Sequence, residues 1–188
     1  MLRRAAIAGL MLVALAGVAA SYLFLTDAMA GTGCDVRAIV GWKPSGSIAY
    51  YSEAFSHGPN CANAVVTIVV RTSKGVPLWV DAMPASQLMT FQRITTGHRM
   101  RAALVEWLDQ PGTFKSSADL PAWAQGADAP AAGEFPFYPE ADVDRDSYEK
   151  TRAAKAPVFC YVQGMESMSC VVLQGGTMSK IGVQSFPG

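Results

Sequence analysis

The chain has 188 residues, 51% of them hydrophobic, and its 15 basic residues balance its 15 acidic ones. A neutral chain without blocks of like charge lacks the basic surface that nucleic acids require, so we expect no nucleic-acid partner. The sequence contains no glycine-rich phosphate loop, no Cys-x-x-Cys pair and no Gly-x-Ser-x-Gly elbow. We therefore expect no cofactor, and the chemistries that those motifs carry are not indicated.

The N-terminus carries the pattern of an exported protein. Arg3 and Arg4 precede an uncharged, largely apolar stretch over residues 5–25. Positive charge before an apolar run keeps the N-terminus in the cytoplasm and sends the following chain across the membrane. We therefore expect the rest of the chain to lie outside the cytoplasm.

Residues 1–30 have two interpretations. A small-x-small site ends at Ala30 and suits cleavage by a signal peptidase, but the apolar stretch is long enough to span a bilayer, which takes about 20 residues. A lipidated Cys34 is less favoured, because Gly31 stands where an apolar residue is usual. Residues 1–30 are thus a signal peptide or a single-pass inner-membrane anchor. Residues 31–188 are then a single domain on the periplasmic side of a bacterial inner membrane, tethered or soluble.

Four cysteines follow this segment, and an even number in an oxidising compartment predicts two disulfides. Cys160 and Cys170 are each five residues from Met165, so a hairpin centred on Met165 brings them face to face. Of the three possible pairings we therefore favour Cys160–Cys170 with Cys34–Cys61, and a single bridge with two free thiols is the alternative.

The first half of the chain reads as two hairpins. Residues 36–42 and 48–53 are apolar or aromatic runs on either side of a turn at 43–46. Residues 65–70 are all β-branched and do not alternate between apolar and polar, which predicts a central strand covered on both faces. A Ser-Lys-Gly turn returns the chain into a partner strand at 76–80.

The middle of the chain changes to helical periodicity. Thr96 is a good N-cap for a helix whose apolar stripe ends at Leu108. Residues 84–91 suit a short helix, and a second capped helix is predicted from Asp146 to Lys155. Between the helix that ends at Leu108 and the helix that begins at Asp146 lies a Pro/Ala/Gly-rich segment, residues 111–139. It is too long for an ordinary connection and is either functional or mobile.

Three more strands are predicted at 158–163, 168–174 and 178–186. Strands gathered at both ends, with helices between them, indicate an α+β fold. We expect a mostly antiparallel sheet of about six or seven strands, with two or three helices packed on one face, preceded by an N-terminal hydrophobic helix.

Two metal sites are weakly suggested. Asp142, Asp144 and Asp146 resemble the start of a calcium loop, but Gly and Glu are missing at its later positions. Soft ligands for copper(I) gather late in the chain, without a Met/His repeat. Those ligands are Met165, Met168, Cys170 and Met178. Acids at a helix N-terminus and gap-filling methionines explain both patterns better, so we expect no metal.

Three classes of function remain open. A cell-wall hydrolase would need acids such as Glu53 or Glu106 to converge with His57, which nothing in their spacing requires. A non-catalytic domain that binds an envelope protein or a glycan would instead use exposed aromatic residues, and this is the reading we favour. The candidate binding residues are Trp42, Tyr50, Tyr51, Trp79 and Trp123. A purely structural, tethered domain is the third possibility.

Overall fold

A computed structural model describes residues 33–42, 50–130 and 134–186. The predicted hydrophobic helix at 5–25, the cleavage site after Ala30 and the turn at 43–46 lie outside these residues. The helices that are described are all too short or too polar to cross a membrane.

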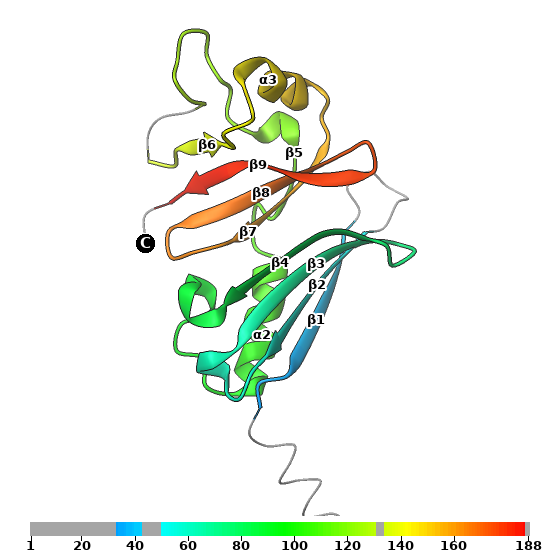
Figure 1. Cartoon of the computed structure of the whole chain (residues 1–188), viewed down its shortest axis with the longest axis vertical. Coiled ribbons are helices and arrows are strands. Elements are labelled where there is room, and N and C mark those ends of the chain that lie inside the picture. The colour runs from blue at the N-terminus through cyan, green and yellow to red at the C-terminus, as the bar shows by residue number, and fades with distance from the viewer. Residues whose placement is uncertain (1–32, 43–49, 131–133, 187–188) are drawn as a thin grey trace, which may run out of the picture. The chain divides into compact units, whose positions relative to one another are not determined.

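The first sheet has four antiparallel strands in the order β1-β2-β3-β4 (Figure 1). They are β1 (Val36–Trp42), β2 (Tyr50–His57), β3 (Val65–Thr72) and β4 (Pro77–Pro84). Both predicted hairpins are therefore present, and β3 lies inside the sheet. On its outer face, Val69 is 4% exposed but Val65 is 44% exposed. The prediction of a strand covered on both faces is wrong for that residue.

The second sheet has five strands in the order β5-β7-β8-β9-β6. They are β5 (Phe114–Ser116), β6 (Phe137–Pro139), β7 (Pro157–Val162), β8 (Ser167–Gln174) and β9 (Thr177–Ser185). The prediction of one sheet with six or seven strands is thus wrong, although the α+β class is confirmed. The described strands form two separate ladders, and the long 111–139 segment contributes two short strands, β5 and β6, which pair with β7 and β9 at the two edges of the second sheet.

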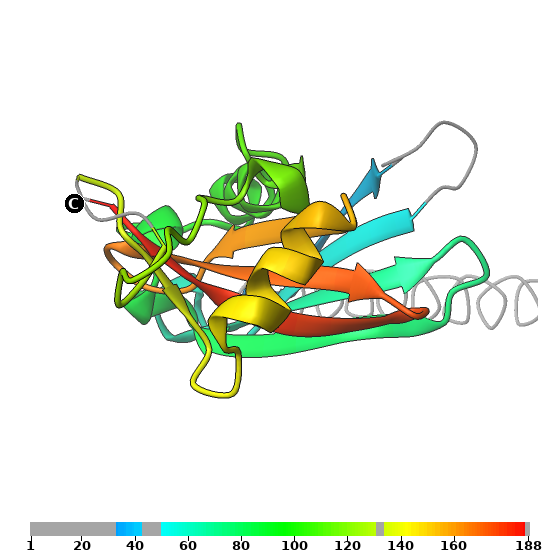
Figure 2. The ribbon, with the colours of Figure 1, turned by 90° about the horizontal axis from the view of Figure 1, so that it is seen from above.

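The helices pack on different sheets, which corrects the prediction of one helical face. Helix α2 (Gly97–Leu108) begins after the predicted N-cap, Thr96, and lies against β1 and β2. Helix α3 (Arg145–Ala153) lies on the second sheet, as Figure 2 shows from above. Its cap is Asp144, two residues before the predicted Asp146. The short helix expected at 84–91 is a pair of 3₁₀ turns, η2 (Ala85–Gln87) and η3 (Met89–Phe91). Two further 3₁₀ turns, η1 (Cys61–Asn63) and η4 (Ser117–Asp119), follow β2 and β5.

The main core joins the two sheets through aromatic side chains. Trp107 of α2 is buried, and its ring packs edge-on against Phe91 and Tyr161. Its indole N–H donates a 2.8 Å hydrogen bond to the carbonyl of Val162 at the end of β7. One side chain of α2 therefore contributes apolar burial and also satisfies a buried backbone acceptor of the second sheet.

A chain of side-chain hydrogen bonds also links the two sheets. The indole N–H of Trp79 on β4 donates to the Tyr161 hydroxyl at 2.9 Å, and that hydroxyl donates to Asp81 at 2.7 Å. Burial, followed by the hydrogen bond to Asp81, raises the pKa of Tyr161 well above its ordinary range. The hydroxyl therefore stays protonated and remains a donor at physiological pH.

Both disulfides pair as predicted. Cys34 is bonded to Cys61, and Cys160 to Cys170. Cys160 and Cys170 are direct partners in the β7–β8 register, as the hairpin geometry requires. The second bridge lies in a smaller core between the second sheet and α3, which also contains Phe137 and Tyr148. All four cysteines are buried.

Glu149 of α3 fastens the 111–139 segment to that smaller core. Its carboxylate accepts 2.7 Å hydrogen bonds from the Trp123 backbone N–H and from Arg152. The bond from Trp123 is the main reason that the pKa of Glu149 lies below its ordinary value. Because the folded-state pKa is lowered, the contribution to stability is present at neutral pH. It is lost as the pH falls from the unfolded-state pKa of about 4.3 through the folded-state value.

We predict that Glu149→Gln reduces the loss of stability on acidification from about pH 6 to about pH 3. Urea midpoints at the two pH values measure this loss. Glu106→Gln, on the exposed side of α2, is the control and should lose as much stability as the wild type. Equal acid sensitivity of Glu149→Gln and the wild type would show that Glu149 has no such role.

Candidate binding face on the first sheet

The first sheet turns one face toward α2 and the core and the other toward solvent. Strand register places Gly41, Tyr51 and Arg71 side by side on the solvent face, and Ile39 beside Glu53 in the neighbouring row. With Arg37 and Val80, these residues are called the outer face below. Apolar side chains are exposed on three of its strands. They are Ile39 (51% exposed), Tyr51 (41%) and Val80 (56%).

An ion triplet lies at the centre of the outer face. Glu53 is almost covered, with a side chain 10% exposed, and it accepts a hydrogen bond on each carboxylate oxygen. Arg37 donates through Nε from β1, and Arg71 donates through Nε at 3.1 Å from β3. Two cations around one anion leave a local charge of +1 and hold the charged groups in fixed positions.

A hollow of about 280 Å³ opens between this triplet and the exposed apolar residues. Its lining consists of Arg37, Ile39, Tyr51, Glu53 and Arg71. Gly41, opposite Tyr51, leaves one flank of the tyrosine open, because a Cβ added there would meet no atom within 4 Å. Glycine inside a strand often marks a place where another molecule approaches closely.

The other four aromatic residues expected to bind lie in or against the cores. Trp42 is buried, and its ring stacks on the ring of Phe114 with the ring centroids 5.1 Å apart. The ring of Tyr50 packs against Trp42 with the centroids 5.3 Å apart. Trp79 is held by Tyr161 as described above. Trp123 packs edge-on against Tyr148, and its indole N–H donates to the Ala127 carbonyl at 2.8 Å. Of the five aromatic residues expected to bind, only Tyr51 lies on the outer face.

The side chains expected of a hydrolase do not converge. Glu53 lies on the outer face and is engaged by two arginines. Glu106 lies on the exposed side of α2, and α2 packs on the opposite face of the same sheet. His57 Nδ1 lies 2.6 Å from Asp35 Oδ1 at the exposed end of β2, where both side chains are solvated.

Three of the side chains suggested as metal ligands make other interactions. Asp144 caps α3 by accepting a 2.8 Å hydrogen bond from Ser147 N–H, and hydrogen bonds from Ser147 keep the pKa of Asp144 below its ordinary value. Asp146 contacts Arg145 at 3.6 Å. Cys170 is oxidised and offers no thiolate. Within the described ranges, no three His, Cys, Asp or Glu side chains are grouped as metal ligands.

Sequence reasoning missed Arg37, Gly41 and Arg71, because strand register alone brings them beside Tyr51. The one available signal was Gly41, a glycine inside an otherwise apolar strand. Comparisons of the chain with protein-family models, curated proteins and solved structures find no match.

Proposed function

We propose that residues 31–188 form a non-catalytic, extracytoplasmic binding domain that takes a glycan on the outer face of the first sheet. One observation carries the proposal: an exposed Tyr51 stands beside an open strand position, Gly41, and next to fixed charged groups. Two disulfides fit an oxidising compartment.

The chemistry of the outer face suits a sugar ring. A pyranose presents C–H groups on its faces and hydroxyls around its rim, so it binds best where an aromatic ring adjoins directional hydrogen-bonding groups. Tyr51 offers the ring, and Gly41 leaves space above the strand for the sugar to approach. Arg37, whose side chain is 63% exposed, and Arg71 offer donors to hydroxyl, N-acetyl or carboxylate oxygens.

The compartment narrows the choice of glycan. In this proposal the domain lies on the periplasmic side of the inner membrane, tethered through residues 5–25 or released after Ala30. The mass of the intact protein distinguishes the two forms. The cell-wall glycan lies within reach of either, and the carboxylates of its peptide stems complement the +1 charge around Glu53. The experiment below also distinguishes glycan binding from two alternatives, a protein partner at the same face and a purely structural role.

We predict that Tyr51→Ala weakens co-sedimentation with purified cell-wall sacculi by about two- to twelvefold, since aromatic contacts contribute about 0.5–1.5 kcal/mol. Gly41→Val should weaken it at least as much, because the new side chain fills the space beside Tyr51. A β-branched residue suits a strand, and a Cβ added at this position would meet no atom of the fold within 4 Å, so the urea midpoint should not fall.

The matched control is Tyr138→Ala, which removes a tyrosine that is 53% exposed on β6 of the other sheet. It should sediment as the wild type does. Wild-type protein that stays in the supernatant, or variants at Tyr51 and Gly41 that sediment normally, would reject the glycan assignment. Crosslinking to one envelope protein that depends on Tyr51, without sacculus binding, would replace the glycan with a protein partner.

A further inference from the structure

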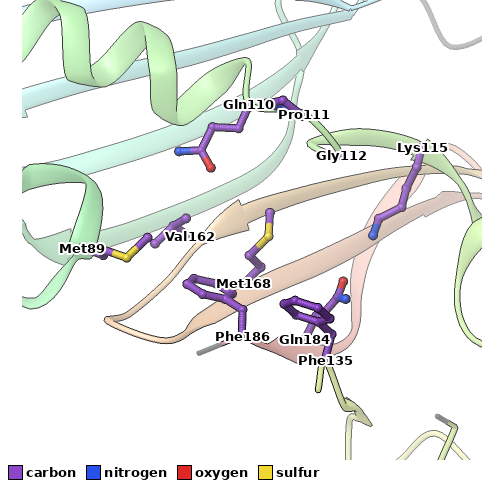
Figure 3. Close-up of a pocket in the computed structure, with 10 residues that line it drawn as sticks. All are labelled: Met89, Gln110, Pro111, Gly112, Lys115, Phe135, Val162, Met168, Gln184 and Phe186. Carbon is purple, nitrogen blue, oxygen red and sulfur yellow. The ribbon is translucent and has the colours of Figure 1, made fainter. Parts of the chain in front are cut away.

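A second hollow, of about 390 Å³, lies at the end of the second sheet, on different strands from the outer face (Figure 3). It is called the Lys115 pocket below. Its lining comes from η3, from the loop after α2, from β5, from the ends of β7, β8 and β9, and from Phe135. The full lining is Met89, Gln110, Pro111, Gly112, Lys115, Phe135, Val162, Met168, Gln184 and Phe186.

The walls of the Lys115 pocket are mostly apolar. Figure 3 shows the thioethers of Met89 and Met168 and the rings of Phe135 and Phe186 around one space. Phe135 is 49% exposed, so its ring is accessible to a molecule that enters the pocket. Methionine side chains are flexible and polarisable, so such walls adapt to a chain-like apolar guest.

Lys115 is the one charged side chain among these ten residues, and strand alternation explains its position. Phe114 points into the main core, where it packs on Trp42 and Phe159. The next residue must therefore face the other side of the sheet. Figure 3 shows the Lys115 ammonium pointing into the pocket toward the Gln184 carboxamide.

The environment of Lys115 is unfavourable for its charge. Burial lowers the pKa of Lys115, and Asp119 offsets part of this effect. The ion pairs found among the described residues do not include Lys115. A partly desolvated ammonium with no contacting carboxylate gains most from an anion that enters with an apolar body.

We propose that the Lys115 pocket binds a single-chain carboxylate amphiphile, such as a medium-chain fatty acid. The carboxylate pairs with Lys115 and accepts from the side-chain amides of Gln110 or Gln184, and the alkyl chain lies between Met89, Met168 and the two phenylalanine rings. The volume is at the low end of the range of about 300–1,000 Å³ for ligand pockets, which favours one chain over a two-chain lipid.

The first test uses decanoate, below its micelle concentration, on the protein in the form that the cell exports, labelled with ¹³C at the methionine methyl groups. Met89 and Met168 should shift on titration, whereas Met100, a residue of α2 that is buried in the main core, should not. Decanol, with the same chain and no charge, should bind about tenfold more weakly, and decyltrimethylammonium should bind more weakly still.

The second test separates charge from shape. Lys115→Met keeps an apolar chain of similar length, so we predict that it removes the preference for decanoate over decanol while decanol binding persists. Lys74→Met, on the exposed β3–β4 turn, removes the same charge elsewhere and should leave the preference intact. An unchanged preference in Lys115→Met, or no shift at Met89 and Met168, would overturn the proposal. So would a Lys115-dependent preference for an apolar peptide with a free C-terminal carboxylate over decanoate. None of these outcomes bears on glycan binding at Tyr51.

Discussion

Trp107→Ala is expected to destabilise the domain by about 3–5 kcal/mol, the usual cost of truncating a buried aromatic residue. Trp107 is 1% exposed, and it lies where α2 meets both sheets. The variant would also leave the Val162 carbonyl without its indole donor. Since whole domains are stable by about 5–15 kcal/mol, this loss should lower the urea midpoint by a large fraction.

Two variants separate the contributions of Trp107. Trp107→Phe keeps most of the ring volume and removes the N–H donor, so it should cost clearly less than the alanine variant. Trp123→Ala, at the partly exposed margin of the smaller core, should also cost less. If Trp107→Ala lowered the midpoint no more than Trp123→Ala did, α2 would not be the link between the two sheets.

The second large effect concerns the disulfides. In the chain-entropy model, the bridge over 27 residues between Cys34 and Cys61 contributes about 3.5 kcal/mol, and the bridge over 10 residues between Cys160 and Cys170 about 2.7 kcal/mol. Replacing each pair by alanine should therefore destabilise the protein, and more strongly for the first pair. Urea unfolding of the two double variants measures the loss in the free energy of unfolding for each pair.

The comparison of the two bridges contains its own control. All four cysteines are almost fully buried, so the cost of truncating the side chains is similar in both double variants. The difference between the variants then reports loop length. A first-pair variant that is at least as stable as the second-pair variant would contradict the entropic account.

Local features of the fold could be predicted from the sequence. The β7–β8 hairpin and its disulfide follow from two cysteines placed symmetrically about Met165, and α2 follows from Thr96 and a 3.6-residue stripe. Both depend on residues close together in the chain, where spacing determines geometry.

The division into two sheets could not be predicted, because a strand's own pattern does not say which hairpin its free edge meets. Strands β5 and β6 have three residues each, too few to show a period. Their positions depend on tertiary contacts, such as the stacking of Phe114 on Trp42. Sheet membership therefore emerges only when distant segments are placed together.

The candidate site was only half predictable for the same reason. Adjacent Tyr50 and Tyr51 had to point to opposite faces of β2, but the sequence did not say which face was covered. The ring of Tyr50 packs against Trp42 in the core, so Tyr51 lies on the solvent face of the sheet. Arg37 and Arg71 are 34 positions apart in the sequence. Only the register of three strands reveals that they share Glu53.

Amide chemical-shift mapping with soluble cell-wall glycan fragments tests the central claim most directly. Glycan binding at the outer face predicts shifts at Ile39, Gly41 and Tyr51 that saturate with ligand, and that disappear in Gly41→Val while the rest of the spectrum is retained. Shifts confined to the second sheet, or no shifts at any fragment concentration, would contradict the claim that the outer face is a glycan-binding surface.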